Sequence, residues 1–255
     1  MYRGFELKNL KEDFFGERYH SYLDIGHEIF NKQKKEVKKT LNDFVNHDGS
    51  LDGEKMKSNW FPKMEANIFL SHSHSDEELI VAFAGWLKKH FDLKAFIDSC
   101  VWGYFMELQR DIDNRFRGNG KLDYNKVLYV ASHVNMMLNT ALMQMIDTCE
   151  CVIFVNTPNS VKANEVVDKV VSPWIYSELG MTKLIKKKGL NEYRSSVLIE
   201  NSEYFSELSI EYDLDTNHLT ELNNLNLRMW RLMKNLEKND HPLDVLYRMK
   251  KQRRS

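Results

Sequence analysis

The chain has 255 residues, of which 42% are hydrophobic and 29% are charged, a composition typical of a globular protein with a substantial core. Its 36 basic and 37 acidic residues give a formal net charge of −1, which excludes a strong overall field that would attract nucleic acid or an anionic membrane. The first twenty residues are charged throughout, and no stretch approaches the roughly 18 apolar residues of a membrane span. Three cysteines are too few for a disulfide framework, and they indicate buried thiols in a reducing compartment. We therefore expect a soluble cytoplasmic protein that binds neither nucleic acid nor membrane.

Residues 1–65 are predicted to form a helical N-terminal extension. Apolar residues recur there at helical spacing with lysines between them, namely Ile25, Ile29, Val37, Leu41 and Phe44. The turn-forming segment "HDGSLDGEK" interrupts this pattern, and the main domain begins near residue 66. We expect the apolar stripe to cover either the main domain or a partner chain.

Residues 66–236 alternate short apolar runs with helical patterns. The predicted strands are "NIFLS" (67–71), "KAFIDS" (94–99), "CVIFVNTP" (151–158), "SSVLIE" (195–200) and "LSIEYDL" (208–214). Helical patterns cover 77–91, with Asp76 at its N-terminus, and then 103–116, 132–150, 172–189 and 219–238. Strands without polar alternation indicate a parallel sheet covered on both faces. The prediction is a flavodoxin-like α/β domain, followed by a basic, solvated C-terminal tail at residues 237–255.

Ligands of such folds bind beyond the carboxyl ends of the strands, which selects four places in this chain. They are "SHSHSD" after the first strand, "DSCVWG" after the second, "NTPNS" after the third, and the helix that holds Glu178. No P-loop, G-x-G-x-x-G, G-x-S-x-G or H-E-x-x-H pattern is present. His72 and His74 form an H-x-H pair, but zinc needs three or four ligands, so a structural or substrate-contact role is favoured and no metal is predicted.

Four segments occur in an order and spacing that resembles a Toll/interleukin-1 receptor (TIR) domain. "IFLSHSHSD" looks like the first strand and loop of that family, "KAFIDS" like its second strand, and "VIFVNTPNS" like its central strand. "SPWIYSEL" looks like its Trp-x-x-x-Glu helix start. The resemblance covers residues 67 to about 200.

The resemblance implies an activity, because many bacterial TIR domains cleave NAD+ at the nicotinamide–ribose bond. Some release ADP-ribose, and others, as in Thoeris anti-phage defence, make a cyclic signalling nucleotide that an effector protein senses. The catalytic glutamate of those relatives matches Glu178, and the aromatic residue matches Trp174. Ser71 and His72 in the first loop, with Asp98 and Trp102 in the loop that gates the site in TIR domains, are the implied substrate contacts. No cofactor beyond NAD+ as substrate is implied, and self-association through TIR surfaces is expected.

Elementary chemistry supports this assignment, because breaking an N-glycosidic bond develops positive charge on the ribose that a carboxylate can stabilise. Spacing of four residues puts Trp174 and Glu178 on one helix face, where the indole is either a pocket wall or a core anchor. By composition alone, Glu178 would be a surface helix residue. Arg110, Arg115 and Arg117 either meet a diphosphate or lie on a solvated helix face.

Two alternatives to this enzyme remain open. Many TIR domains act as non-catalytic scaffolds that assemble with other TIR domains. A nucleoside deoxyribosyltransferase-like enzyme has a related fold and also breaks an N-glycosidic bond with a glutamate. The sequence leaves open whether the product is linear or cyclic, what triggers the enzyme, and what residues 1–65 do.

Overall fold

The computed structural model describes residues 1–35, 41–115, 124–162, 169–170, 172–194, 212–213 and 216–250. Some of these are described by their backbone alone, namely residues 35, 41–42, 101–104, 161–162, 169–170, 194 and 212–213. Of the described helices, none is long and apolar enough to cross a membrane.

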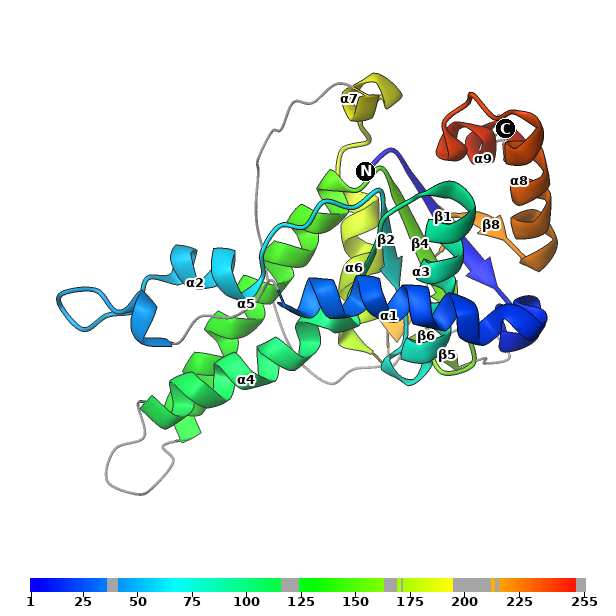
Figure 1. The fold of residues 1–255 in the computed structure, drawn as a ribbon. Coiled ribbons are helices and arrows are strands. Elements are labelled where there is room, and N and C mark those ends of the chain that lie inside the picture. The colour runs from blue at the N-terminus through cyan, green and yellow to red at the C-terminus, as the bar shows by residue number, and fades with distance from the viewer. Residues whose placement is uncertain are drawn as a thin grey trace.

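A five-stranded sheet forms the centre of the molecule, with all strands parallel in the order β3-β2-β4-β1-β8 (Figure 1). Its strands are β1 (Arg3–Lys8), β2 (Ile68–Ser71), β3 (Ala95–Ile97), β4 (Cys151–Asn156) and β8 (Thr220–Leu222). A smaller antiparallel sheet contains β5 (Val161–Lys162), β6 (Lys169–Val170) and β7 (Tyr212–Asp213). The three clearest predicted strands are therefore confirmed as β2, β3 and β4.

Helices cover both faces of the sheet, with α1 and α3 on one side and α5 and α6 on the other (Figure 1). The α-helices are α1 (Tyr19–Lys35), α2 (Gly53–Trp60), α3 (Glu77–Phe91), α4 (Ser99–Arg115), α5 (Tyr124–Thr148), α6 (Pro173–Leu184), α7 (Leu190–Arg194), α8 (Asn224–Leu236) and α9 (Pro242–Met249). The short 3-10 helices are η1 (Glu12–Phe14), η2 (Gly16–Arg18), η3 (Leu41–Phe44) and η4 (His74–Asp76). This is the α/β architecture with a covered parallel sheet that the sequence predicts.

The helical pattern in the N-terminal segment has a defined packing partner, because α1 crosses α3 in direct contact. Two glycines allow the contact: a Cβ atom on Gly26 would lie 1.9 Å from the Val81 carbonyl oxygen, and one on Gly85 would lie 1.9 Å from the Tyr22 carbonyl oxygen. The two backbones therefore touch where no side chain fits. The helix α1 therefore covers the main domain, but the buried face holds Tyr22, Gly26 and Phe30, whereas Ile25 and Ile29 of the predicted stripe are only half-buried.

The prediction of a helical N-terminal extension at residues 1–65 is wrong at its start, which forms a strand of the central sheet. Arg3–Lys8 form β1, which lies between β4 and β8 and pairs with β4 from Arg3–Cys151 to Lys8–Asn156. The charged residue Glu6 conceals this strand in the sequence. In the fold the Glu6 carboxylate accepts hydrogen bonds from Asn156 Nδ2 at 2.7 Å and Thr216 Oγ1 at 3.1 Å, which allows its burial.

The C-terminal segment also differs from the prediction of a solvated tail. Residues 242–249 form α9, in which Leu243, Val245 and Leu246 are fully buried. Tyr247 stacks on Phe5 of β1 with ring centroids 6.1 Å apart. The hydrophobic gain of these side chains outweighs the basic character of the segment.

Several predicted boundaries shift in the structure. α4 begins at Ser99 and replaces the predicted loop, α5 begins eight residues before the predicted start at 132, and α6 ends at Leu184 rather than near 189. The predicted strand at 195–200 and most of the one at 208–214 lie outside the described residues. The described part of the latter, Tyr212–Asp213, belongs to the small antiparallel sheet.

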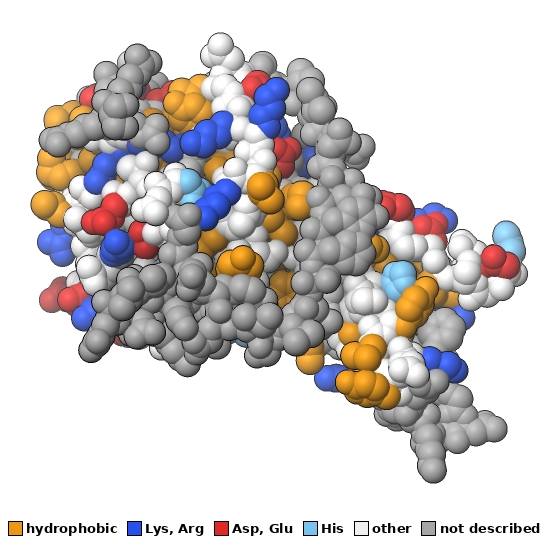
Figure 2. Space-filling view, turned by 180° about the vertical axis from the view of Figure 1, so that it is seen from behind, with side chains coloured by type: hydrophobic (Ala, Val, Ile, Leu, Met, Phe, Trp, Pro, Cys, Tyr) orange, Lys and Arg blue, Asp and Glu red, His pale blue; other side chains and the backbone are white. Residues whose placement is uncertain are grey.

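The outer surface carries mixed charge and one apolar projection. On the face in Figure 2, basic and acidic side chains are interspersed, in agreement with the net charge of −1. The helices α4 and α5 run side by side and project from the body (Figure 1), and apolar side chains gather on this projection (Figure 2). Exposed members include Tyr124, Leu128 and Tyr129 of α5.

Candidate functional site

Four of the six predicted site residues meet at the carboxyl edge of the sheet. Ser71 is the last residue of β2, and Asp98 directly follows β3. The β2–β3 register pairs Leu70 with Ile97, which places Ser71 and Asp98 at adjacent positions. Glu178 reaches the same place from α6 and completes the group with His72.

The sequence at the start of α6 directs Glu178 inward. Ser172 caps the helix by accepting a hydrogen bond from the Ile175 backbone N–H, and Pro173 occupies the first turn, where its missing N–H costs nothing. Ile175 and Leu179 are buried against Phe154 of β4. Glu178 is three residues after Ile175 and therefore lies on the same side of the helix, where it is buried as well.

Glu178 is buried, and only 1% of the residue is exposed to solvent. Ser71 Oγ donates a hydrogen bond to Glu178 Oε2 at 2.5 Å, whereas Oε1 makes no hydrogen bond to any described group. Burial, and then the neighbouring Asp98 carboxylate, raise the pKa of Glu178 well above its ordinary value, although the Ser71 bond opposes this. An acid in this position is under electrostatic strain whenever it is ionised.

His72 and Asp98 form the other half of the cluster. His72 Nδ1 lies 2.7 Å from Asp98 Oδ1, which is ion-pair distance, although the angles are not those of a well-formed hydrogen bond. Burial is the largest influence on the pKa of His72 and lowers it, but Asp98, a backbone contact to Leu70 and the charge of Glu77 together outweigh burial, so the pKa of His72 is raised. When it is protonated, the imidazole partly neutralises the Asp98 charge that faces Glu178.

A second layer of hydrogen bonds joins the loops after β2 and β4. Asp76 is predicted as the side-chain cap of α3, but its side chain makes no capping bond. Its carboxylate instead accepts hydrogen bonds from Thr157 Oγ1 at 2.5 Å and Asn159 Nδ2 at 2.7 Å. Sequence reasoning selected both loops as strand ends but missed these contacts, which only the adjacency of β2 and β4 creates.

The two aromatic candidates, Trp174 and Trp102, have different places in the structure. Trp174 is half-buried and packs edge-to-face on Phe105 of α4, with ring centroids 5.5 Å apart, so it contacts the hydrophobic core. Trp102 belongs to the first turns of α4 instead of a loop, and its side chain lies outside the described residues.

The two arginine candidates that the structure describes, Arg110 and Arg115, are not part of this cluster. Arg110 and Arg115 are exposed on α4 at 11 and 16 residues from its start at Ser99, or about 17 and 24 Å along a helix. This position agrees with the solvated alternative. Arg117 lies outside the described residues.

The histidine pair does not form a metal site. His72 is buried against Asp98, whereas His74 is exposed at the start of η4. Among the described residues, one group of potential metal ligands has its ligand atoms within 4.8 Å of one another, namely Glu150, His241 and Asp244. Glu150 immediately precedes β4, so this group lies at the opposite edge of the sheet from Glu178.

The three cysteines are buried thiols, as predicted. Burial raises the pKa of Cys149 to about 12, so its reactive thiolate is absent at neutral pH. The chemistry of the cluster therefore rests on carboxylates, one hydroxyl and one imidazole. Comparison of the chain with protein-family models, curated proteins and solved structures finds no match.

Proposed function

We propose that the protein is a TIR-type enzyme that cleaves the nicotinamide–ribose bond of NAD+. One observation carries the proposal: the Glu178 carboxylate lies beside Ser71, at the sheet edge where ligands of parallel α/β folds bind, in surroundings that strain its charge. A carboxylate that the fold shields from water is suited to stabilise a developing cation.

The reaction would break the bond between C1′ of the ribose and N1 of nicotinamide. The bonding electrons leave with nicotinamide, which becomes neutral, so no strong general acid is required. The Glu178 carboxylate stabilises the positive charge that develops at C1′. Water then adds to C1′ with loss of a proton to give ADP-ribose. Capture by a nitrogen or hydroxyl of the same molecule gives a cyclic product instead.

Each neighbour of Glu178 has a role in this scheme. Ser71 holds the carboxylate in place through its short hydrogen bond. Asp98 adds negative potential that stabilises the positive charge as it moves from the nicotinamide ring to the ribose, and His72 holds Asp98. The positive charge of bound NAD+ would lower the pKa of Glu178 and favour its ionised form at the moment of reaction.

The burial of Glu178 adds one requirement to the proposal. Because the residue is 1% exposed, NAD+ reaches it only after neighbouring side chains or segments move. Self-association of the chain is the event that we propose to open the site. The use of the product as a signalling nucleotide in anti-phage defence, and its detection by an effector protein, rest on the sequence resemblance.

The direct test is to incubate the purified protein with NAD+, with and without a crowding agent, and to separate nicotinamide, ADP-ribose and cyclic products by chromatography. We expect nicotinamide to appear in step with one ribosyl product, and faster under crowding. Absence of turnover in every assembled state would reject the enzyme and favour a scaffold. Cleavage of deoxynucleosides in place of NAD+ would favour a deoxyribosyltransferase.

A further inference from the structure

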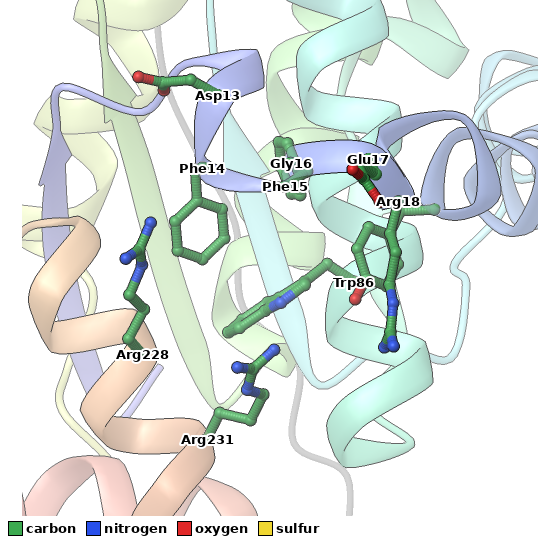
Figure 3. A pocket seen from close by; sticks show the side chains of 10 residues that line it. Asp13, Phe14, Phe15, Gly16, Glu17, Arg18, Trp86, Arg228 and Arg231 are labelled. Carbon is green, nitrogen blue, oxygen red and sulfur yellow. The ribbon is translucent and has the colours of Figure 1, made fainter.

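A cavity lies apart from the Glu178 cluster and shares no residue with it. It has a volume of about 490 Å³ and is formed by the segment between β1 and α1, together with α1, α3 and α8 (Figure 3). This volume is within the range of sites for small organic ligands, roughly 300–1,000 Å³. It is larger than a single inorganic anion would need.

The chain builds this cavity from segments that are far apart in the sequence. After β1, Phe15 joins the two short helices η1 and η2, and η2 begins at Gly16, whose positive φ of 57° is readily adopted by glycine. Arg228 and Arg231 project from one face of α8 because they are three residues apart. Asn224 Nδ2 donates a hydrogen bond to the Asn9 carbonyl oxygen at 3.1 Å, which ties the start of α8 to the end of β1.

Three guanidinium groups line the cavity: Arg18, Arg228 and Arg231. None of them forms an ion pair with a residue that the structure describes, although Asp13 and Glu17 also line the cavity. In Figure 3 the guanidinium groups of Arg228 and Arg231 point toward the aromatic rings, whereas the Asp13 carboxylate points away from them.

Aromatic rings form the wall between these charges. Phe14 packs edge-to-face on Trp86, with ring centroids 5.4 Å apart, and the Arg228 guanidinium lies 5.9 Å from the Phe14 ring centre. Phe14 is only half-buried, so part of its ring faces the cavity. A planar ligand ring is attracted to such a surface.

The adjacent His90 responds to the positive charge of this region. His90 Nε2 and the Tyr22 hydroxyl share a hydrogen bond of 2.9 Å, and Tyr22 lines the cavity. Burial, and then the charges of Arg231 and Arg18, lower the pKa of His90 to about 4. The positive charges of Arg18 and Arg231 therefore extend to the ring beside the cavity.

We infer that this cavity binds a phosphorylated, nucleotide-sized ligand. The forked donors of Arg228 and Arg231 match the oxygens of a diphosphate, and Arg18 lies on the same cavity for a further anionic oxygen. The base of the ligand lies against the exposed part of the Phe14 ring, which the buried Trp86 supports from behind. This inference does not depend on the proposed reaction at Glu178, because the two sites share no side chain.

Isothermal titration calorimetry with ADP tests the inference. Pyrophosphate probes the proposed diphosphate contact alone, and adenosine probes the proposed base contact alone. We expect saturable binding of ADP, competition by pyrophosphate, weaker binding at higher salt, and much weaker binding of adenosine. The double variant Arg228→Ala, Arg231→Ala should bind ADP at least ~10-fold more weakly, because two charge-assisted contacts are lost.

Arg110→Ala is the matched control, since Arg110 is an exposed arginine on α4 and does not line the cavity. It should bind ADP like the unchanged protein. Arg228→Lys keeps the positive charge and removes the two parallel donors of the guanidinium, so its affinity for ADP should lie between those of the unchanged protein and the double variant. It also serves as a milder substitution in case the double variant misfolds. No saturable binding of ADP, or equal binding by the double variant with its melting temperature intact, would overturn the inference.

Discussion

Replacement of Glu178 by Gln gives a stability measurement that probes the strained carboxylate without any substrate. The ionised Glu178 side chain costs several kcal/mol to bury, and its charge-assisted bond from Ser71 returns about 1 kcal/mol more than a neutral bond would. The Gln amide keeps the acceptor for Ser71 and adds a donor toward Asp98. We therefore expect Glu178→Gln to raise the free energy of unfolding by about 2 kcal/mol at pH 8, or ~4–8 °C in melting temperature.

The sign of this effect depends on pH in a defined way. The pKa of Glu178 is raised in the folded state, so the folded protein holds the proton more tightly than the unfolded chain. The stabilisation from this group is complete below the unfolded pKa, near 4.5, and is lost as the pH rises through the folded pKa. The Gln variant does not titrate, so its advantage should be close to zero near pH 4 and grow toward pH 8.

Thermal unfolding of both proteins across pH 4–8, followed by circular dichroism, measures this difference. Glu107→Gln is the matched control, since Glu107 is exposed on α4, and its curve should follow that of the unchanged protein. A difference that is independent of pH, or a Gln variant that is less stable at pH 8, would refute the argument that Glu178 is strained.

Three further predictions concern other parts of the molecule. Gly26→Ala places a Cβ atom 1.9 Å from the Val81 carbonyl oxygen and should lower the free energy of unfolding by about 1–3 kcal/mol in urea titrations; an unchanged midpoint would contradict the helix contact. Ser71→Ala removes the donor to Glu178 and should slow nicotinamide release about 10- to 100-fold with the fold intact, whereas an unchanged rate would show that Ser71 does not position the carboxylate. Cys149 and the other two thiols should react with a disulfide reagent only as fast as the protein unfolds, and rapid labelling of the folded chain would disprove their burial.

Much of the sheet and the core of the candidate site could be predicted from the sequence. The apolar segments of β2, β3 and β4 lack polar alternation, which is the pattern of buried parallel strands. Once these strands are parallel, their carboxyl ends meet at one edge, so Ser71 and Asp98 had to lie close together. The helical spacing around Glu178 then indicated which residues share its face.

What the sequence concealed depends on contacts between distant segments. The buried charge of Glu6 disguised β1, since its partners Asn156 and Thr216 lie 150 and 210 residues away. The apolar residues of α9 were hidden among basic ones, and burial on β1 decides their place. The arginine-lined cavity also depends on a contact between the segment after β1 and α8, for which local patterns carry no signal.

The most direct test of the central claim compares the rates of nicotinamide release by the unchanged protein, Glu178→Gln and Glu107→Gln under the same assembled condition. We expect the Glu178 variant to fold normally and to lose activity by ~1,000-fold or more, about 4 kcal/mol of transition-state stabilisation, while the Glu107 variant keeps its rate. A folded Glu178→Gln protein that releases nicotinamide at the unchanged rate would contradict the account.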